Sequence, residues 1–139
     1  MLIPVIFSFW LNGRTRTKKD RKEAGQIFNI LQDEIKSNLD NNLNKAFSSE
    51  YLSVLGEEIL KVKTGILATH YKDPLDNFIK IYRQFVNINK ALLDYNNLDK
   101  PTLPANINAM IPQIVAKNEI IRLRQLCKEQ IVIYLNQTF

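Results

Sequence analysis

Apolar residues recur at spacings of three and four along most of the chain after residue 20, a pattern typical of amphipathic helices. The first stripe extends over about 25 residues and comprises Ala24, Ile27, Phe28, Leu31, Ile35, Leu39, Leu43 and Ala46. The sequence Phe47-Ser48-Ser49-Glu50 then predicts a break with candidate N-caps. We expect a second helix from near Ser49, with an apolar face made of Tyr51, Leu52, Leu55, Ile59, Leu60 and Val62. Gly56 and Gly65 mark points where that helix can bend or stop.

A third helix is predicted to begin at Asp73-Pro74, with Asp73 as N-cap and Pro74 at the first helical position. One face of this helix carries Leu75, Phe78, Tyr82, Phe85, Leu92 and Tyr95, and Ile79, Val86, Ile88 and Leu93 widen it. A polar, proline-bearing connection covers residues 96–104, and a final helix is predicted from near Asn108 or Pro112 to Asn136. Residues 62–67 could form one short strand, but a single strand has nothing to pair with. The pattern therefore predicts an all-α fold, an antiparallel bundle of about four helices.

The N-terminal stretch differs from the rest of the chain. Residues 1–11 are apolar apart from Ser8, Asn12-Gly13 ends this apolar run, and residues 14–22 are basic. As a helix, the apolar run reaches only about 16 Å, roughly half of a bilayer's hydrocarbon thickness. Three interpretations stay open: part of a longer transmembrane helix, an interfacial anchor, or an apolar arm that packs on protein. We predict an apolar membrane segment at 1–13, a basic juxtamembrane stretch at 14–22 and a cytosolic helical bundle at 23–139.

Charge is concentrated in the same place. The chain has a formal net charge of +5, yet residues 14–22 contain six basic residues and one acidic residue, which leaves 13 of each elsewhere. A tryptophan at the polar boundary followed by clustered cations is the order expected at the cytoplasmic end of a membrane helix. A secretory signal would place its cations before the apolar run. The predicted membrane-binding residues, at the inner membrane, are Ile3, Ile6, Phe7, Phe9, Trp10, Leu11, Arg14, Arg16, Lys18, Lys19, Arg21 and Lys22.

Residues suited to catalysis are scarce. With one cysteine and one histidine, the chain cannot form an intramolecular disulfide or a multi-Cys/His zinc site. Four glycines without a phosphate-binding arrangement make the familiar modes of nucleotide binding improbable. His70 is expected at the surface before a helix start, and Cys127, in line with Leu123 and Ile131, is expected to be a small buried hydrophobe. We predict no catalytic residues, no metal and no cofactor.

The last predicted helix contains the one distributed polar cluster. Lys117, Arg124 and Lys128 are spaced seven and four apart, so they share a face, and Arg122 flanks it. These four residues are candidates for binding an anionic ligand, and the alternative is a charged outer face that pairs with acidic residues of the same helix. Separately, Asn38, Asn42 and Asn89 fall near apolar stripes, where a polar side chain can fix helix register. The broad apolar faces predict a homo-oligomer.

Three short segments resemble a loose group of small prokaryotic proteins that have a membrane helix, a basic juxtamembrane stretch and a cytosolic helical domain. Residues 33–39 (Asp-Glu-Ile-Lys-Ser-Asn-Leu) are similar to the group's Glu-Ile-x-x-Asn-Leu, and residues 63–67 to its Gly-x-Leu turn. Tyr82-x-x-Phe85-x-x-Ile88-Asn89 is similar to its Tyr-x-x-Ile-x-x-Leu-Asn. The resemblance implies a membrane-anchored helical module. A related type, the small membrane effectors of type III CRISPR defence, implies a cytosolic domain that binds cyclic oligoadenylate.

The sequence thus predicts a non-enzymatic helical module that senses, recruits or assembles at the cytoplasmic face of a prokaryotic membrane. One alternative is an antiviral-type membrane effector whose cytosolic domain binds a cyclic oligonucleotide. A second is a soluble adaptor that binds protein or nucleic acid through the basic stretch. The absence of aromatic residues among these cations makes nucleic acid the less favoured partner.

Overall fold

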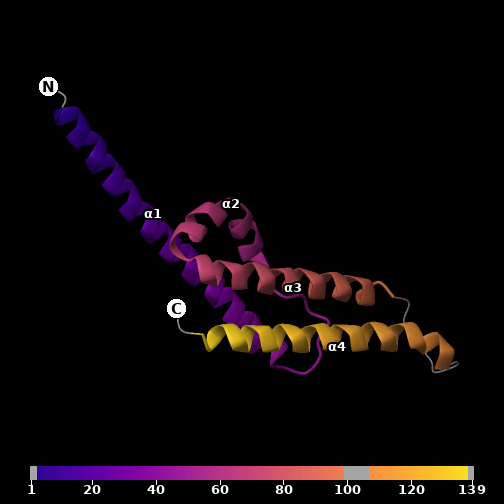
Figure 1. Cartoon of the computed structure of the whole chain (residues 1–139). Coiled ribbons are helices and arrows are strands. Elements are labelled where there is room, and N and C mark those ends of the chain that lie inside the picture. The colour runs from indigo at the N-terminus through magenta and orange to yellow at the C-terminus, as the bar shows by residue number, and fades with distance from the viewer. Residues whose placement is uncertain (1–2, 99–106, 138–139) are drawn as a thin grey trace.

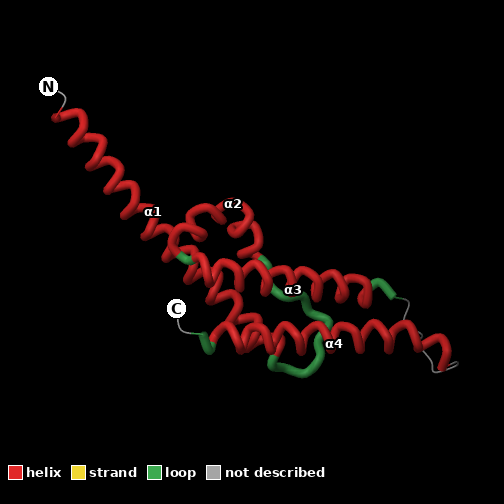
Figure 2. The backbone as a smooth tube through the Cα atoms, viewed as in Figure 1, coloured by secondary structure: helices red, strands yellow, loops and turns green. Residues whose placement is uncertain are grey.

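The computed structural model describes residues 3–98 and 107–137, with side chains placed from Lys18 onward. Four α-helices follow one another: α1 (Ile3–Asn38), α2 (Leu55–His70), α3 (Lys72–Asn96) and α4 (Ile107–Leu135). One π-helical turn, Leu39–Leu43, directly follows α1. No strand occurs within these two ranges, and residues 62–67 are part of α2. The expected all-α class with four helices is confirmed (Figures 1 and 2).

The two long C-terminal helices lie side by side and run in opposite directions (Figure 1). Near the beginning of α3, the Asn77 amide donates to Gln137 just beyond α4, at 3.4 Å. Near the other end, the Gln113 amide of α4 donates to the Tyr95 hydroxyl at 3.5 Å. α1 crosses this pair and α2 arches over α1 and α3, so the four helices enclose one core.

The core contains most of the residues that the stripes predicted. On α3, all six residues of the predicted face are buried: Leu75, Phe78, Tyr82, Phe85, Leu92 and Tyr95. On α1 the buried stripe comprises Ala24, Ile27, Leu31 and Ile35, and it continues into Leu39 and Leu43 of the π turn. Edge-on aromatic contacts join the helices, since the Phe78 ring meets Tyr134 of α4 at a centroid distance of 5.4 Å. These side chains hold α1, α3 and α4 together.

α1 is longer than the sequence predicts. The predicted helical stripe begins only after residue 20, whereas α1 runs without interruption from Ile3 to Asn38. At 36 residues it spans about 54 Å. Its N-terminal part, residues 3–22, which we call the N-terminal arm, projects away from the other three helices (Figure 1). No helix in the described part of the chain meets the length and hydropathy needed for a membrane crossing.

The second helix also differs from the prediction. It begins at Leu55 rather than near Ser49, and residues 47–54 form an irregular connection. Of the predicted apolar face, Leu52 and Leu60 are buried, while Tyr51, Leu55 and Val62 are exposed. The distortion within α2 lies at Lys63, whose φ and ψ are −111° and 16°, rather than at a glycine. Because α2 is short and covers only one end of the bundle, part of its apolar surface, including Leu55 and Val62, packs against no other helix.

The start of α3 is two residues earlier than expected. Tyr71 is the N-cap, without a side-chain capping bond, and Asp73 lies within the first turn instead of capping it. The Tyr71 ring stacks on Phe28 of α1 with the centroids 4.7 Å apart. The short α2–α3 corner is therefore held by an aromatic contact with α1 rather than by an aspartate cap.

Candidate functional site

Two asparagine side chains hold the irregular connection between the π turn and α2. Asn38, at the end of α1 and only 1% exposed, donates to the Ser53 carbonyl at 2.8 Å and accepts from the Ser53 amide at 3.0 Å. Asn89 of α3 makes the same pair of bonds with Leu52, at 2.9 and 2.7 Å. Each amide thus pairs with the backbone as a neighbouring strand would, so residues 52–53 are bound between α1 and α3. The sequence predicted that Asn38, Asn42 and Asn89 fix helix register, but Asn38 and Asn89 hold the backbone of this connection instead, and Asn42 donates to the Asn38 side chain.

A single carboxylate caps the beginning of α2. The Glu34 carboxylate accepts from the backbone amides of Leu55 and Gly56, at 3.1 and 2.8 Å, and from the Ser53 hydroxyl at 2.6 Å. Tyr82 of α3 donates its hydroxyl to the same carboxylate at 2.7 Å. A negative charge at a helix N-terminus complements the helix dipole and satisfies otherwise unpaired N–H groups. Burial, reinforced by the bond to Glu34, raises the pKa of Tyr82, so this hydroxyl stays a proton donor.

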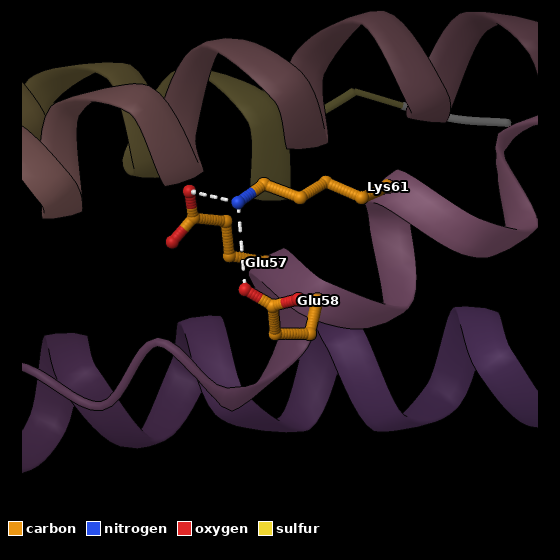
Figure 3. Close-up of polar contacts among 3 residues, drawn as sticks. All are labelled: Glu57, Glu58 and Lys61. Carbon is orange, nitrogen blue, oxygen red and sulfur yellow. Dashed lines mark hydrogen bonds and ion pairs between the residues drawn. The ribbon is translucent and has the colours of Figure 1, made fainter.

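Above the Tyr82 ring, α2 and α3 form an open groove of about 350 Å³. Its lining combines four apolar or aromatic side chains with four that carry charges or a hydroxyl: Leu60, Ile79, Tyr82, Val86, Glu57, Lys61, Thr64 and Arg83. The Lys61 ammonium lies 3.4 Å from both the Glu57 and the Glu58 carboxylates, and its side chain points toward them along α2 (Figure 3). These two carboxylates raise the pKa of Lys61, Glu58 contributing most through its hydrogen bond.

The polar groups of this groove are largely engaged with one another or with their own helix. None of its described lining residues is a histidine or cysteine, and the Thr64 hydroxyl donates to the Leu60 carbonyl within its own helix. The lone ammonium is shared by two carboxylates and is exposed, so each pair contributes little to stability. An apolar floor with an ion pair at the rim can accept an amphipathic side chain or small molecule.

Two of the four candidate anion-binding residues, Lys117 and Arg124, converge on the Phe47 ring, whose centroid lies 6.0 Å from the Arg124 guanidinium carbon, whereas Arg122 pairs with Glu119. Arg124 is 9% exposed and donates to the carbonyl oxygens of Asn42 and Lys45, which lie at and just after the end of the π turn. Lys117 lies over the Phe47 ring with its ammonium 5.0 Å from the centroid. Arg122 points to the other side and bonds Glu119 at 2.9 Å. Lys128 is half-buried beside Arg124 on α4.

Arg124 therefore has a structural role that sequence reasoning did not assign. Burial lowers the pKa of its guanidinium, and the carbonyl groups at the end of a helix supply the partial negative charge that it needs. The hydrogen bond from Arg122 lowers the pKa of Glu119. The i, i+3 spacing of Glu119 and Arg122 signals that pair in the sequence, whereas nothing local signals the contact between Arg124 and residue 42.

The predicted membrane-binding residues fall in two groups. Ile3, Ile6, Phe7, Phe9, Trp10, Leu11, Arg14 and Arg16 belong to α1, but their side chains lie outside the described residues. Lys18, Lys19, Arg21 and Lys22 follow on the same helix and are all exposed. The basic stretch is thus helical, and its last four cations face solvent next to the point where α1 enters the bundle.

The two residues with potential nucleophilic or base chemistry lie on different helices. His70 is half-buried at the end of α2, whereas Cys127 is completely buried on α4. Burial raises the pKa of the Cys127 thiol to about 12, so at neutral pH it is a packed thiol rather than a thiolate. No group of three histidine, cysteine, aspartate or glutamate side chains within 18–98 and 107–137 is arranged to hold a metal ion.

Comparison with family models, with curated proteins and with solved structures finds no match to this chain. The fold and the contacts above are therefore the basis for any functional conclusion. Among them, sequence reasoning identified Asn38 and Asn89 but missed Glu34 and Gly56. The sequence shows Glu34 beside a buried stripe, but its hydrogen-bond partners lie 19 to 48 residues away in the chain, so no local pattern indicates them.

Proposed function

We propose that this protein is a non-enzymatic helical module that docks on the cytoplasmic face of a membrane through its N-terminal arm and assembles there. The observation that carries the proposal is the continuity of α1. One helix contains the apolar residues, the basic stretch and the first face of the core, and its arm projects from the bundle. A lipid-bound arm would therefore set the position of the bundle without an intervening hinge.

The charges of the arm support docking at an anionic surface. Lys18, Lys19, Arg21 and Lys22 are exposed, and each cation close to an anionic membrane contributes about 1 kcal/mol. An apolar run and a polybasic stretch are two signals of the kind that stable membrane attachment requires. Of the three interpretations of the apolar run, an interfacial anchor or part of a longer membrane helix is consistent with an arm that projects from the bundle.

The helical body supports a binding role. Its irregular connection is held by Asn38, Asn89 and Glu34, and its open groove has the mixed lining of a recognition surface. The cyclic-oligonucleotide alternative needs free cations on one face. Arg124, Lys117 and Arg122 are engaged with backbone carbonyls, an aromatic ring and a glutamate respectively. We therefore favour docking and assembly over binding of an anionic ligand on α4.

Vesicle flotation of the full chain tests the docking. Replacing Lys18, Lys19, Arg21 and Lys22 by glutamine should weaken binding to vesicles that contain phosphatidylglycerol by roughly two to three orders of magnitude, because about 4 kcal/mol of attraction is lost. The matched control removes four other exposed cations, Lys72, Lys80, Arg83 and Lys90 of α3, and should bind almost normally. Equal losses in the two variants, or no binding by the unchanged chain, would contradict the proposal.

A further inference from the structure

A second open groove, of about 380 Å³, lies between α1 and α2 at the point where the N-terminal arm joins the bundle. Three aliphatic side chains and the hydrocarbon stems of three charged ones line it: Ile27, Ile59, Val62, Glu23, Glu58 and Lys63. We call these six residues the α1–α2 groove. The Glu23 carboxylate pairs with Lys63 at 2.7 Å and the Glu58 carboxylate with Lys61 at 3.4 Å (Figure 3). The surface of the groove is therefore almost entirely apolar, and its acidic groups are neutralised.

The apolar surface continues beyond the groove on the side away from the arm. On α2, Leu55 lies four residues before Ile59 and Val62 three residues after it, so the three share one face. Leu55 is 77% exposed and Val62 is 75% exposed. On α1, Ile30 lies one turn beyond the groove and is 52% exposed. The Leu55 amide donates to Glu34, one turn after Ile30, so these two exposed aliphatic residues extend the groove at the same end.

At its other end, toward the arm, the α1–α2 groove adjoins a shallow cationic pocket. This pocket has a volume of about 540 Å³, is lined by Lys19, Lys22, Glu23 and Gln26, and shares Glu23 with the groove. Within the described part of the chain, no carboxylate forms an ion pair with Lys19 or Lys22. Two uncompensated ammonium groups thus lie at one end of a channel that is otherwise apolar.

A cationic end joined to an apolar channel is complementary to an amphiphile that has an anionic head and one hydrocarbon chain. The two lysines and the Gln26 amide are donors suited to the oxygens of a phosphate, and the pocket has room for a headgroup larger than a carboxylate. From Glu23 to Ile30, α1 rises about 10 Å, which matches the greater part of an acyl chain, since one leaflet contributes about 15 Å to a bilayer's hydrocarbon core. The groove is bounded by one helix on each side, so it accommodates a single chain.

We infer that this site binds a single-chain anionic phospholipid, a lysophospholipid, with its phosphate at Lys19 and Lys22 and its acyl chain along Ile27, Ile59 and Val62. The inference deepens the proposed function and rests on it for the place where the lipid is met. The groove begins where the arm leaves the bundle, so a lysophospholipid of the docked leaflet lies beside the cationic end (Figure 1). A partner helix or a second copy would cover the aliphatic floor but would leave both ammonium groups without an anion.

Protection of an introduced thiol in the full chain tests the site. Saturating lysophosphatidylglycerol, below its critical micelle concentration, should slow the reaction of a Val62→Cys variant with a water-soluble maleimide by about tenfold or more, because only the unoccupied fraction reacts. Val115→Cys, at an aliphatic position 61% exposed on α4, is the control and should react at an unchanged rate. The native Cys127 is completely buried and does not interfere. No protection, equal protection at both positions, or equal protection by a monoacylglycerol of the same chain length would overturn the inference. Protection that rises with protein concentration without lipid would also overturn it, in favour of a second copy.

Two pairs of charge variants separate this site from docking in general. In the Val62→Cys background, Lys19→Gln with Lys22→Gln should raise the lysophosphatidylglycerol concentration for half protection by about tenfold to thirtyfold. Lys18→Gln with Arg21→Gln removes the same charge from the same stretch of α1 outside the pocket, and should raise it by less than about threefold. Both pairs should weaken flotation with phosphatidylglycerol vesicles alike, since that attraction follows total charge. Equal effects of the two pairs on protection would overturn the inference. Failed flotation of the unchanged chain with protection intact would overturn the docking proposal alone.

Discussion

Gly56 lies at the closest approach between α2 and the helices beneath it. A Cβ atom at this position would overlap both the Tyr82 hydroxyl and a Leu31 methyl group, and the glycine itself is buried. The glycine is needed here for space and not for an unusual backbone angle, since no described glycine has a positive φ. The amide of Gly56 also donates to Glu34, so close approach and capping occur at the same residue.

We expect Gly56→Ala to destabilise the protein by about 1–3 kcal/mol, because the added methyl group forces Tyr82 or Leu31 away from its position. Gly65→Ala is the matched control on the same helix. Nothing lies within 4 Å of a Cβ added there, so the higher helix propensity of alanine should raise stability by up to about 1 kcal/mol. Urea denaturation measures both changes, and equal effects of the two substitutions would refute this explanation.

Helix boundaries that depend on the local hydrophobic pattern, such as those of α4, could be predicted from sequence. The beginning of α2, which depends on contacts with other helices, could not. α3 and α4 each pack along one side for most of their length, so the stripe on α3 and the extent of α4 could be predicted from sequence. The beginning of α2 could not, because residues 47–54 have apolar side chains at helical spacing but are held by Asn38 and Asn89 from other helices. Tertiary hydrogen bonds outweighed the local pattern in that segment.

The capping of α2 by Glu34 should be measurable as stability. Glu34→Ala removes the acceptor of four hydrogen bonds and leaves the Tyr82 hydroxyl and the Gly56 amide without this partner, which should cost about 2–4 kcal/mol. Asp33→Ala changes the adjacent, exposed carboxylate and should cost less than about 0.5 kcal/mol. Thermal or urea unfolding followed by circular dichroism compares them, and similar stabilities would mean that Glu34 does not hold α2.

At the scale of the molecule, the sequence predicted a bundle and a separate apolar N-terminal segment, and the structure makes the N-terminal residues from Ile3 on part of the bundle's first helix. Asn12-Gly13 ends the apolar run but not the helix, although glycine costs a helix about 1 kcal/mol. For the candidate anion site, the sequence predicted the shared helix face but not the contacts of each side chain. Shared helical phase placed Lys117, Arg124 and Lys128 together, but phase alone does not reveal that Arg124 points at the end of the π turn.

In the proposed mode of docking, the N-terminal arm enters the lipid interface while the bundle stays outside it. Trp10 is the only tryptophan of the chain, so its fluorescence reports on the arm alone. On addition of vesicles containing phosphatidylglycerol, the emission of the full chain should shift to the blue and be quenched by lipids brominated on their acyl chains. Emission that neither shifts nor is quenched at vesicle concentrations far above those needed for polybasic binding would contradict the claim.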